Sequence, residues 1–224
     1  AALCCRAGWK EILNMAAREP KPIFWDVDTQ ADFMLAGGRL YVPHAETIIP
    51  NLKRLVEFAR AQKLLIVSSA DAHQTNDEEF QQWPPHCLVG TPGQQKIPET
   101  VAERRFVIPN LPGSALPFTF DGYEQIVIEK QKLDVFTNPN IETVLSLLGK
   151  RPVTLFGVVT EYCVAWAARG LLERGYPVHI VTDAMKTLNE PAGRATIESL
   201  VASGATLTDT SSVLRGAAYR GERA

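Results

Sequence analysis

Cys163 is the residue in this sequence best placed to act as a nucleophile. It begins a predicted helix directly after the turn GVVTEY, residues 157–162. Free backbone N–H groups and the helix dipole at such a position favour a thiolate over a thiol. The same N–H groups would stabilise the oxyanion that forms when the thiolate attacks a carbonyl carbon. A lone free cysteine is more often a small buried residue, so this interpretation depends on the partners of Cys163.

Two charged residues at the ends of other predicted strands are candidate partners. Asp28 ends the apolar run 21–28, and Lys130 ends the run 123–130. Asp28 would take the thiol proton and return it to a leaving amine, provided that burial raises its pKa. Lys130 would hold the acid and the developing charge in place. Singly, the aspartate is better explained as a helix cap and the lysine as a surface residue; together with Cys163 they indicate acyl transfer.

The segment DAHQTNDEEFQQWPPHC, residues 71–87, has the composition of a metal site. Asp71 and His73 flank one residue, and His86 follows thirteen residues after His73. Carboxylate and imidazole ligands together suit a borderline divalent ion. The sequence has four histidines, and two of them lie in this one polar loop. We therefore expect a divalent metal ion here, zinc first, with iron and manganese as alternatives.

Alternating strands and helices must position these residues. Apolar runs predict strands over 21–28, 64–71, 123–130, 151–160, 177–184 and 205–214, with 104–110 as a short candidate element of unassigned type. Helical spacing predicts helices over 40–63, 140–150, 161–176 and 190–204. The pattern predicts an α/β fold, a three-layer αβα sandwich with a mainly parallel, Rossmann-like sheet. Such sheets bind ligands outside the carboxyl ends of their strands, where all the candidate residues fall. The irregular stretch 72–122 is expected to be a functional insertion.

Length and composition narrow the class of protein. The chain of 224 residues is long enough for one domain with a sizeable core. A net charge of −2 with no basic stripe argues against a nucleic-acid partner, and no run approaches the roughly 20 apolar residues of a membrane span. Four cysteines without CxxC spacing fit a reducing, cytoplasmic setting. Residues 1–20 are predicted to be an N-terminal extension, in which Met15 is an alternative start that would make residues 1–14 an upstream addition.

Three ordered motifs resemble the isochorismatase-like cysteine hydrolases. DTQADF (28–33) resembles the opening aspartate motif of that family, IVIEKQKLDVF (126–136) its lysine strand and GVVTEYCV (157–164) its nucleophile turn. The resemblance implies one hydrolase domain over 21–224. It also implies a catalytic triad, an oxyanion hole and a cis peptide bond. Their residues are Asp28, Lys130 and Cys163 for the triad, the N–H groups of Val159 and Cys163 for the hole, and Val158–Val159 for the peptide.

The metal loop narrows the resemblance to the nicotinamidase, or pyrazinamidase, branch. DAH (71–73) with WPPHCLVGTPG (83–93) resembles the metal loop of that branch. The implied ligands are Asp71, His73 and His86, with Glu79 as a fourth contact, direct or through water. The implied substrate-binding residues are Phe33 and Trp83, which would sandwich a ring, and Tyr162 beside the nucleophile. Members are commonly homo-oligomers. One departure is Glu161, which stands where aspartate is usual.

The resemblance implies hydrolysis of a small carboxamide through a cysteine thioester, nicotinamide giving nicotinic acid and ammonia. The first alternative is an amidohydrolase that acts on an N-carbamoyl or ureido substrate with the same triad. It would not need a metal, so bound metal distinguishes the two functions. A non-catalytic binding module on a doubly wound sheet is a second alternative. Neither GxGxxG nor GxxxxGK[ST] follows a strand in the sequence, which argues against nucleotide binding.

Overall fold

Seven strands form a single sheet in the computed structural model, which describes residues 20–216. The strands are β1 (Ile23–Val27), β2 (Ile66–Asp71), β3 (Arg105–Ile108), β4 (Gln125–Lys130), β5 (Val153–Val158), β6 (Val178–Lys186) and β7 (Thr206–Thr208). Their order is β3-β4-β2-β1-β5-β6-β7, and each neighbouring pair is parallel. The predicted N-terminal extension, with Cys4 and Cys5, lies outside the described residues apart from residue 20. The parallel sheet agrees with the sequence prediction.

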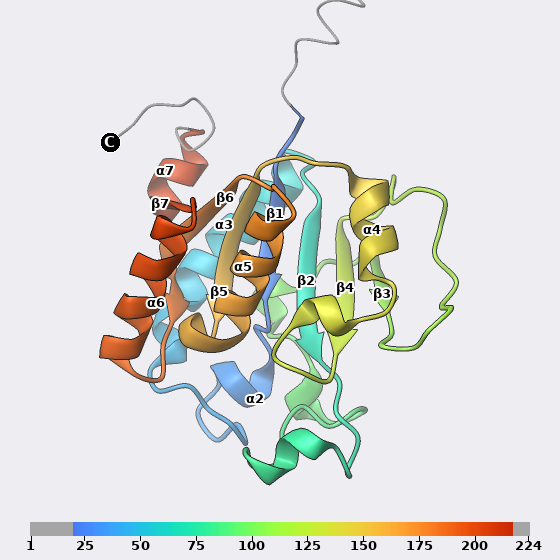
Figure 1. Cartoon of the computed structure of the whole chain (residues 1–224), viewed down its shortest axis with the longest axis vertical. Helices are drawn as coiled ribbons and strands as arrows, with labels where there is room; N and C mark the ends of the chain where they lie inside the picture. Colours follow the sequence, from blue (N-terminus) through green and yellow to red (C-terminus); the bar gives the residue numbers. More distant parts are fainter. Residues whose placement is uncertain (1–19, 217–224) are drawn as a thin grey trace, which may run out of the picture.

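Helices cover both faces of the sheet (Figure 1). One layer contains α2 (Ala31–Met34), α3 (Ile49–Ala61) and α7 (Thr210–Leu214), and the other contains α4 (Ile141–Leu148), α5 (Ala165–Glu173) and α6 (Glu190–Ala202). Successive strand residues point to opposite faces, so Phe24 packs in the core with Leu52 of α3, while Trp25 packs in the core with Leu171 of α5. No helix within residues 20–216 combines the length and the apolar character needed to cross a membrane. The predicted three-layer αβα sandwich is confirmed.

The last predicted strand is shorter than expected. The sequence predicts a strand over 205–214, but β7 ends at Thr208 and α7 follows at once. The side chain of Asp209 accepts a hydrogen bond from the backbone N–H of Ser212 at 2.8 Å. This N-cap satisfies an otherwise free donor and starts the helix, which the apolar pattern alone did not reveal.

The insertion between β2 and β4 is irregular, as predicted, and is fastened to the sheet by buried polar contacts. It contains the short helical turns η2 (Glu78–Gln81), η3 (Pro92–Gln94) and η4 (Pro98–Thr100) besides β3. Lys96 Nζ lies 2.8 Å from an oxygen of Asp26 in β1, and the N–H of Ile97 donates to the carbonyl of Thr29 at 2.9 Å. The N–H of Ala31 donates to the carbonyl of the insertion at residue 95 at 2.8 Å. The insertion that carries the predicted metal ligands His73 and His86 is thus held at the carboxyl end of the central strand β1.

The strand order brings the candidate residues to one edge of the sheet. In the β2–β4 ladder Asp71 is paired with Lys130, each the last residue of its strand. Asp28 directly follows β1, the neighbour of β2, and Cys163 follows β5, the neighbour of β1. Four adjacent strands therefore deliver the four groups to the same place.

Candidate active site

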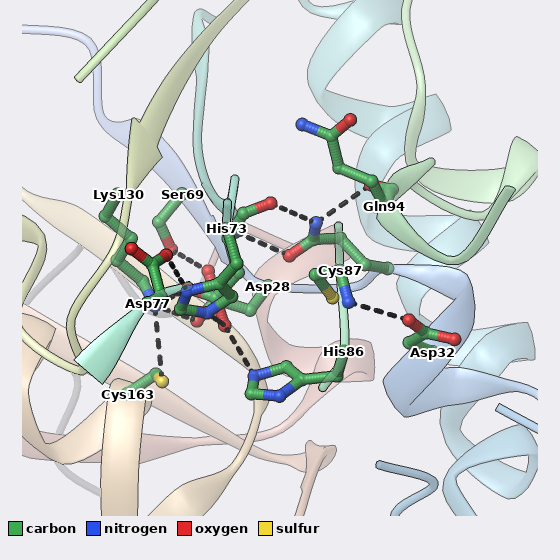
Figure 2. A network of polar contacts seen from close by, with 12 residues as sticks. Asp28, Asp32, Ser69, His73, Asp77, His86, Cys87, Gln94, Lys130 and Cys163 are labelled. Atoms are coloured by element: carbon green, nitrogen blue, oxygen red, sulfur yellow. Dashed lines mark hydrogen bonds and ion pairs between the residues drawn. The ribbon is translucent and has the colours of Figure 1, made fainter. Parts of the chain in front are cut away.

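Lys130 lies at the centre of a buried polar cluster (Figure 2). Its Nζ is 2.9 Å from an oxygen of Asp28 and 3.5 Å from the Sγ of Cys163, and it also forms an ion pair with Asp71. Burial alone would lower the pKa of Lys130, but Asp28 and Asp71 raise it well above its usual value. The lysine is therefore a permanent cation, within reach of both the acid and the sulfur.

Asp28 directly follows β1 and has an uncommon backbone conformation. Its φ of 46° lies in the left-handed region, which a non-glycine residue adopts rarely and aspartate more readily than most. One carboxylate oxygen accepts a 2.6 Å hydrogen bond from Ser69 Oγ. Burial raises the pKa of Asp28 above 3.8, its usual value, although Lys130 opposes the rise. The raised pKa moves this acid toward the working pH, which is the condition that the sequence interpretation sets for Asp28 as acid and base.

Cys163 lies in a distorted turn rather than in the first turn of a regular helix. The helical backbone of η6 (Thr160–Val164) is interrupted at Tyr162, with φ −118° and ψ −105°, and α5 begins only at Ala165. The prediction of a helix over 161–176 is therefore wrong in its first turn. Since Val159 accepts bonds from the N–H groups of Tyr162 and Val164, the turn is wide and presents the sulfur toward Lys130.

The electrostatic setting of Cys163 differs from the one expected. The helix-terminus argument predicts a thiolate, but burial raises the pKa of the Cys163 thiol well above its usual value, while Lys130 opposes this rise. The negative charges of Asp28 and Asp71 raise it further. The thiol is thus the resting form, and it needs a neighbouring base to take its proton.

The predicted oxyanion-hole residues border the same pocket as the nucleophile. Val159 and Cys163 both line it, and the peptide bond between Val158 and Val159 is cis, as the resemblance implies. Gly157, just before this bond, has a φ of +121°, and a Cβ on it would lie 2.1 Å from the carbonyl oxygen of Val27. Only glycine fits at this close approach of β5 to β1, so the backbone dictates the residue at position 157.

Asp71, His73 and His86 form a cluster that fits a divalent cation. The Nε2 atoms of His73 and His86 lie 3.8 and 3.7 Å from the same oxygen of Asp71, and all three ligand atoms lie within 4.8 Å of one another. His73 Nε2 is buried and has no hydrogen-bond partner. An orphaned buried nitrogen facing a carboxylate and a second imidazole is the donor set of a zinc-type site. The three predicted ligands are together.

The outer nitrogen of each histidine is fixed by a second contact, and Figure 2 shows the one between His73 and Asp77. His73 Nδ1 lies 2.7 Å from a carboxylate oxygen of Asp77, and His86 Nδ1 lies 2.8 Å from the carbonyl oxygen of Pro84. Such contacts orient a ring so that Nε2 is free to ligate. Sequence analysis missed Asp77, although its place four residues after a predicted ligand was a usable signal.

Glu79, predicted as a fourth metal contact, lines the pocket outside the three-ligand cluster. Burial raises the pKa of Glu79, and the charge of Asp71 adds to the rise. Its ligation therefore stays a prediction.

The pocket above the cluster is small and largely apolar. About 400 Å³ of space not filled by protein atoms, open solvent at the mouth included, lies between its walls. The predicted ring-binding residues Phe33, Trp83 and Tyr162 line it, and the rings of Trp83 and Tyr162 meet edge to face with centroids 5.4 Å apart. Further apolar walls come from residues that sequence analysis did not name, which are Leu40, Val42, Leu133 and Leu188.

Two buried polar residues of the DTQADF segment hold the metal loop, and sequence analysis gave neither a role. The amide of Gln30 exchanges two hydrogen bonds with the backbone of Asp71, at 2.7 and 2.8 Å. The carboxylate of Asp32 accepts a 2.7 Å bond from the backbone N–H of Cys87, next to His86. Both polar residues lie within the opening motif, so their place in it was the available signal.

Comparison with known proteins agrees with this geometry. The family described as Isochorismatase domain matches residues 26–212. The nicotinamidase of Escherichia coli K12 is 25% identical over 207 residues, covering 81% of this chain and 91% of that protein. The crystal structure of pyrazinamidase of Pyrococcus horikoshii in complex with zinc has a TM-score of 0.69 and 26% identity, covering 85% of this chain and 99% of the other. N-carbamoylsarcosine amidase from Thermoplasma acidophilum has a TM-score of 0.68 and 26% identity, covering 85% and 96%.

Proposed function

The chain belongs to the isochorismatase family, and from this premise we propose that it is a cysteine-dependent amidohydrolase acting on a small neutral ring carboxamide, nicotinamide first. The observation that carries the proposal is the contact of Lys130 Nζ with both Asp28 and the sulfur of Cys163, at 2.9 and 3.5 Å. The similarity to proteins named nicotinamidase and pyrazinamidase supports the same substrate.

In the first half of the reaction Asp28 takes the thiol proton of Cys163 as the sulfur attacks the carboxamide carbon. The C–S bond forms while the electrons of the C=O bond move to oxygen, where N–H groups of the turn stabilise the negative charge. Asp28 then gives its proton to the nitrogen, the C–N bond breaks and ammonia leaves. Lys130 stays charged and offsets whichever of the two groups is negative.

In the second half a water molecule hydrolyses the thioester. Asp28, again a base, takes a proton from the water as its oxygen attacks the acyl carbon. Breaking the C–S bond returns the electron pair to Cys163, which regains the proton from Asp28. The carboxylic acid leaves, and the site returns to its starting state.

Asp71, His73 and His86 would hold a divalent metal ion, and zinc is our first choice because of the zinc complex of the related pyrazinamidase. When bound, such an ion supplies a Lewis acid for a ring nitrogen or for water. The apolar walls from Phe33 and Trp83 would orient the ring between the cluster and the sulfur. Homo-oligomerisation and a cytoplasmic location stay predictions, which size-exclusion chromatography with light scattering and cell fractionation would test.

An N-carbamoyl or ureido substrate is the second candidate, because the fold is also similar to that of N-carbamoylsarcosine amidase. An N-carbamoyl amino acid carries a carboxylate. Among the described residues that line the pocket there is no lysine or arginine, whereas Asp71 and Glu79 are acidic. A neutral ring amide fits these walls better than an anion does. A binding module without activity would not need a buried lysine in contact with both an acid and a cysteine.

The test is ammonia release by the purified protein from nicotinamide and, separately, from N-carbamoylsarcosine. We expect release from nicotinamide that is lost in Cys163→Ala, falls after treatment with a chelator and returns on adding zinc. Metal content of the wild type and of His86→Ala, measured by mass spectrometry, checks the cluster independently of activity. Full activity of Cys163→Ala would refute the mechanism, and release only from N-carbamoylsarcosine would favour the second candidate.

A further inference from the structure

The carboxylate of Glu161 accepts three hydrogen bonds from the segment that joins β6 to α6. The hydroxyl of Thr187 donates at 2.5 Å, and the backbone N–H groups of Leu188 and Asn189 donate at 2.9 and 2.8 Å. Glu161 lies in the turn that carries Cys163, two residues before it. One side chain therefore ties the nucleophile turn to a segment about 26 to 28 residues later in the chain.

The fastened segment contributes a wall to the substrate pocket. Leu188 lines the pocket, and 37% of it is exposed to solvent. Leu40 and Leu133, from two other connections, line it as well. An exposed leucine that borders a pocket loses further apolar surface to water when a ring binds there, and this burial favours binding.

The connection has little freedom to place this leucine elsewhere. A Cβ on Gly193 of α6 would lie 2.5 Å from Thr187 Oγ1, so helix and connection are in close contact. Asn189 caps α6 by accepting from the backbone N–H of Ala192 at 2.9 Å. On the nucleophile side, Thr160 Oγ1 donates to the carbonyl of Lys186 at 2.9 Å. Within the connection Thr187 and Asn189 also bond to each other. The bond to Glu161 is the one hydrogen bond described for the N–H of Leu188.

We propose that Glu161 is a positioning residue that determines substrate specificity by holding Leu188 against the bound ring. This inference rests on the proposed function, since it takes the pocket to be the substrate site. Glu161 acts through Leu188 and touches neither the substrate nor the reacting atoms. Its length matters: aspartate, shorter by one carbon–carbon bond of about 1.5 Å, would lose these bonds or draw Leu188 away from its place in the wall.

The test compares Glu161→Ala, Glu161→Gln, Leu188→Ala and the double variant Glu161→Ala/Leu188→Ala in steady-state hydrolysis of nicotinamide. Glu161→Ala should raise KM about tenfold, the scale of a lost apolar contact, with kcat changed less than about threefold. Leu188→Ala should have a similar effect, and the double variant should exceed it by no more than about twofold, since the two act as one unit. Glu161→Gln keeps an oxygen for both backbone N–H groups and should recover most of the change.

Asp209→Ala is the matched control, because Asp209 also accepts a backbone N–H and a hydroxyl, both from Ser212, but away from the pocket. It should leave KM unchanged. The proposal is overturned if Glu161→Ala leaves KM within twofold of the wild type, if it lowers kcat alone, or if its effect multiplies with that of Leu188→Ala. The second outcome would mean that Glu161 serves the nucleophile turn instead.

Hydrogen exchange followed by mass spectrometry separates failure of this inference from failure of the proposed function. Absence of ammonia release by the wild type would refute the function, and it would appear before any variant is compared. The peptide containing residues 187–189 should exchange faster in Glu161→Ala than in the wild type, but not in Asp209→Ala. Unchanged exchange in Glu161→Ala would overturn the inference whatever the substrate.

Discussion

Replacing Lys96 with methionine should destabilise the protein by leaving a buried carboxylate without its cation. Asp26 is fully buried near the carboxyl end of β1, and the side chain of Lys96 is only 5% exposed, with Nζ 2.8 Å from the carboxylate. After the substitution the carboxylate keeps the hydroxyl bonds from Thr29 at 2.9 Å and Ser68 at 3.1 Å. These two bonds still stabilise the buried negative charge once the lysine is gone.

The structure also sets the expected size of the effect. Removing one partner of a buried ion pair costs about 3–5 kcal/mol, and the two remaining hydroxyl bonds favour the lower end, about 3 kcal/mol. For a chain of this length each kcal/mol shifts Tm by roughly 2–4 °C, so Lys96→Met should lower Tm by about 6–12 °C. Urea unfolding followed by circular dichroism, with thermal unfolding alongside, measures both quantities.

Two further variants make this measurement decisive. Lys53→Met removes a lysine that is 57% exposed and 3.9 Å from Glu57, and it should cost less than about 0.5 kcal/mol. The double variant Asp26→Asn/Lys96→Met removes both buried charges and should recover at least half of the loss. The reasoning fails if Lys96→Met is no more destabilising than Lys53→Met, or if the double variant is no more stable than Lys96→Met.

Three further predictions concern Asp28 and the glycine of β5 that precedes the nucleophile turn. Asp28→Asn should lower kcat for ammonia release by about 10²–10⁴, the usual contribution of a positioned acid–base group; a loss below tenfold would contradict the assigned role. Burial raises the pKa of Asp28 in the folded protein above the unfolded value of about 3.8. The wild type should therefore lose stability relative to Asp28→Asn as the pH rises from about 4 through the folded pKa. A difference between the two urea unfolding midpoints that stays constant across this pH range would contradict the prediction. Gly157→Ala should cost at least about 3 kcal/mol through its clash with Val27 and its positive φ, whereas Gly204→Ala, with positive φ but open space, should cost less; equal costs in the unfolding assay would exclude the clash.

Most of the fold could be predicted because the central strands are buried on both faces. β1 and β5 are buried throughout and largely apolar, and their ends coincide with Asp28 and with the turn before Cys163. The failures occur where a single polar contact decides the local structure. Asp209 ends β7 by capping α7, and such a contact leaves almost no trace in apolar periodicity.

The properties of the site residues were less predictable than their identities. The thiol pKa of Cys163 depends on how deeply the folded chain buries it, and the local argument from the helix terminus gave the wrong direction. Likewise, apolar periodicity does not distinguish Gln30 from an exposed glutamine, although its amide pairs with the backbone of Asp71. Burial and long-range hydrogen bonds are properties of the assembled fold, which periodicity does not encode.

Asp71 shows why the two halves of the site lie together. One of its oxygens forms the ion pair with Lys130, and the other faces the Nε2 atoms of His73 and His86. Sequence motifs place Asp71 and Lys130 at strand ends, and Asp28 and Cys163 after strand ends, but only the order β4-β2-β1-β5 makes those ends neighbours. A different strand order would leave all motifs intact and would separate the lysine from both acids. The proposed catalytic arrangement is therefore a consequence of topology, and it depends on the register that pairs Asp71 with Lys130.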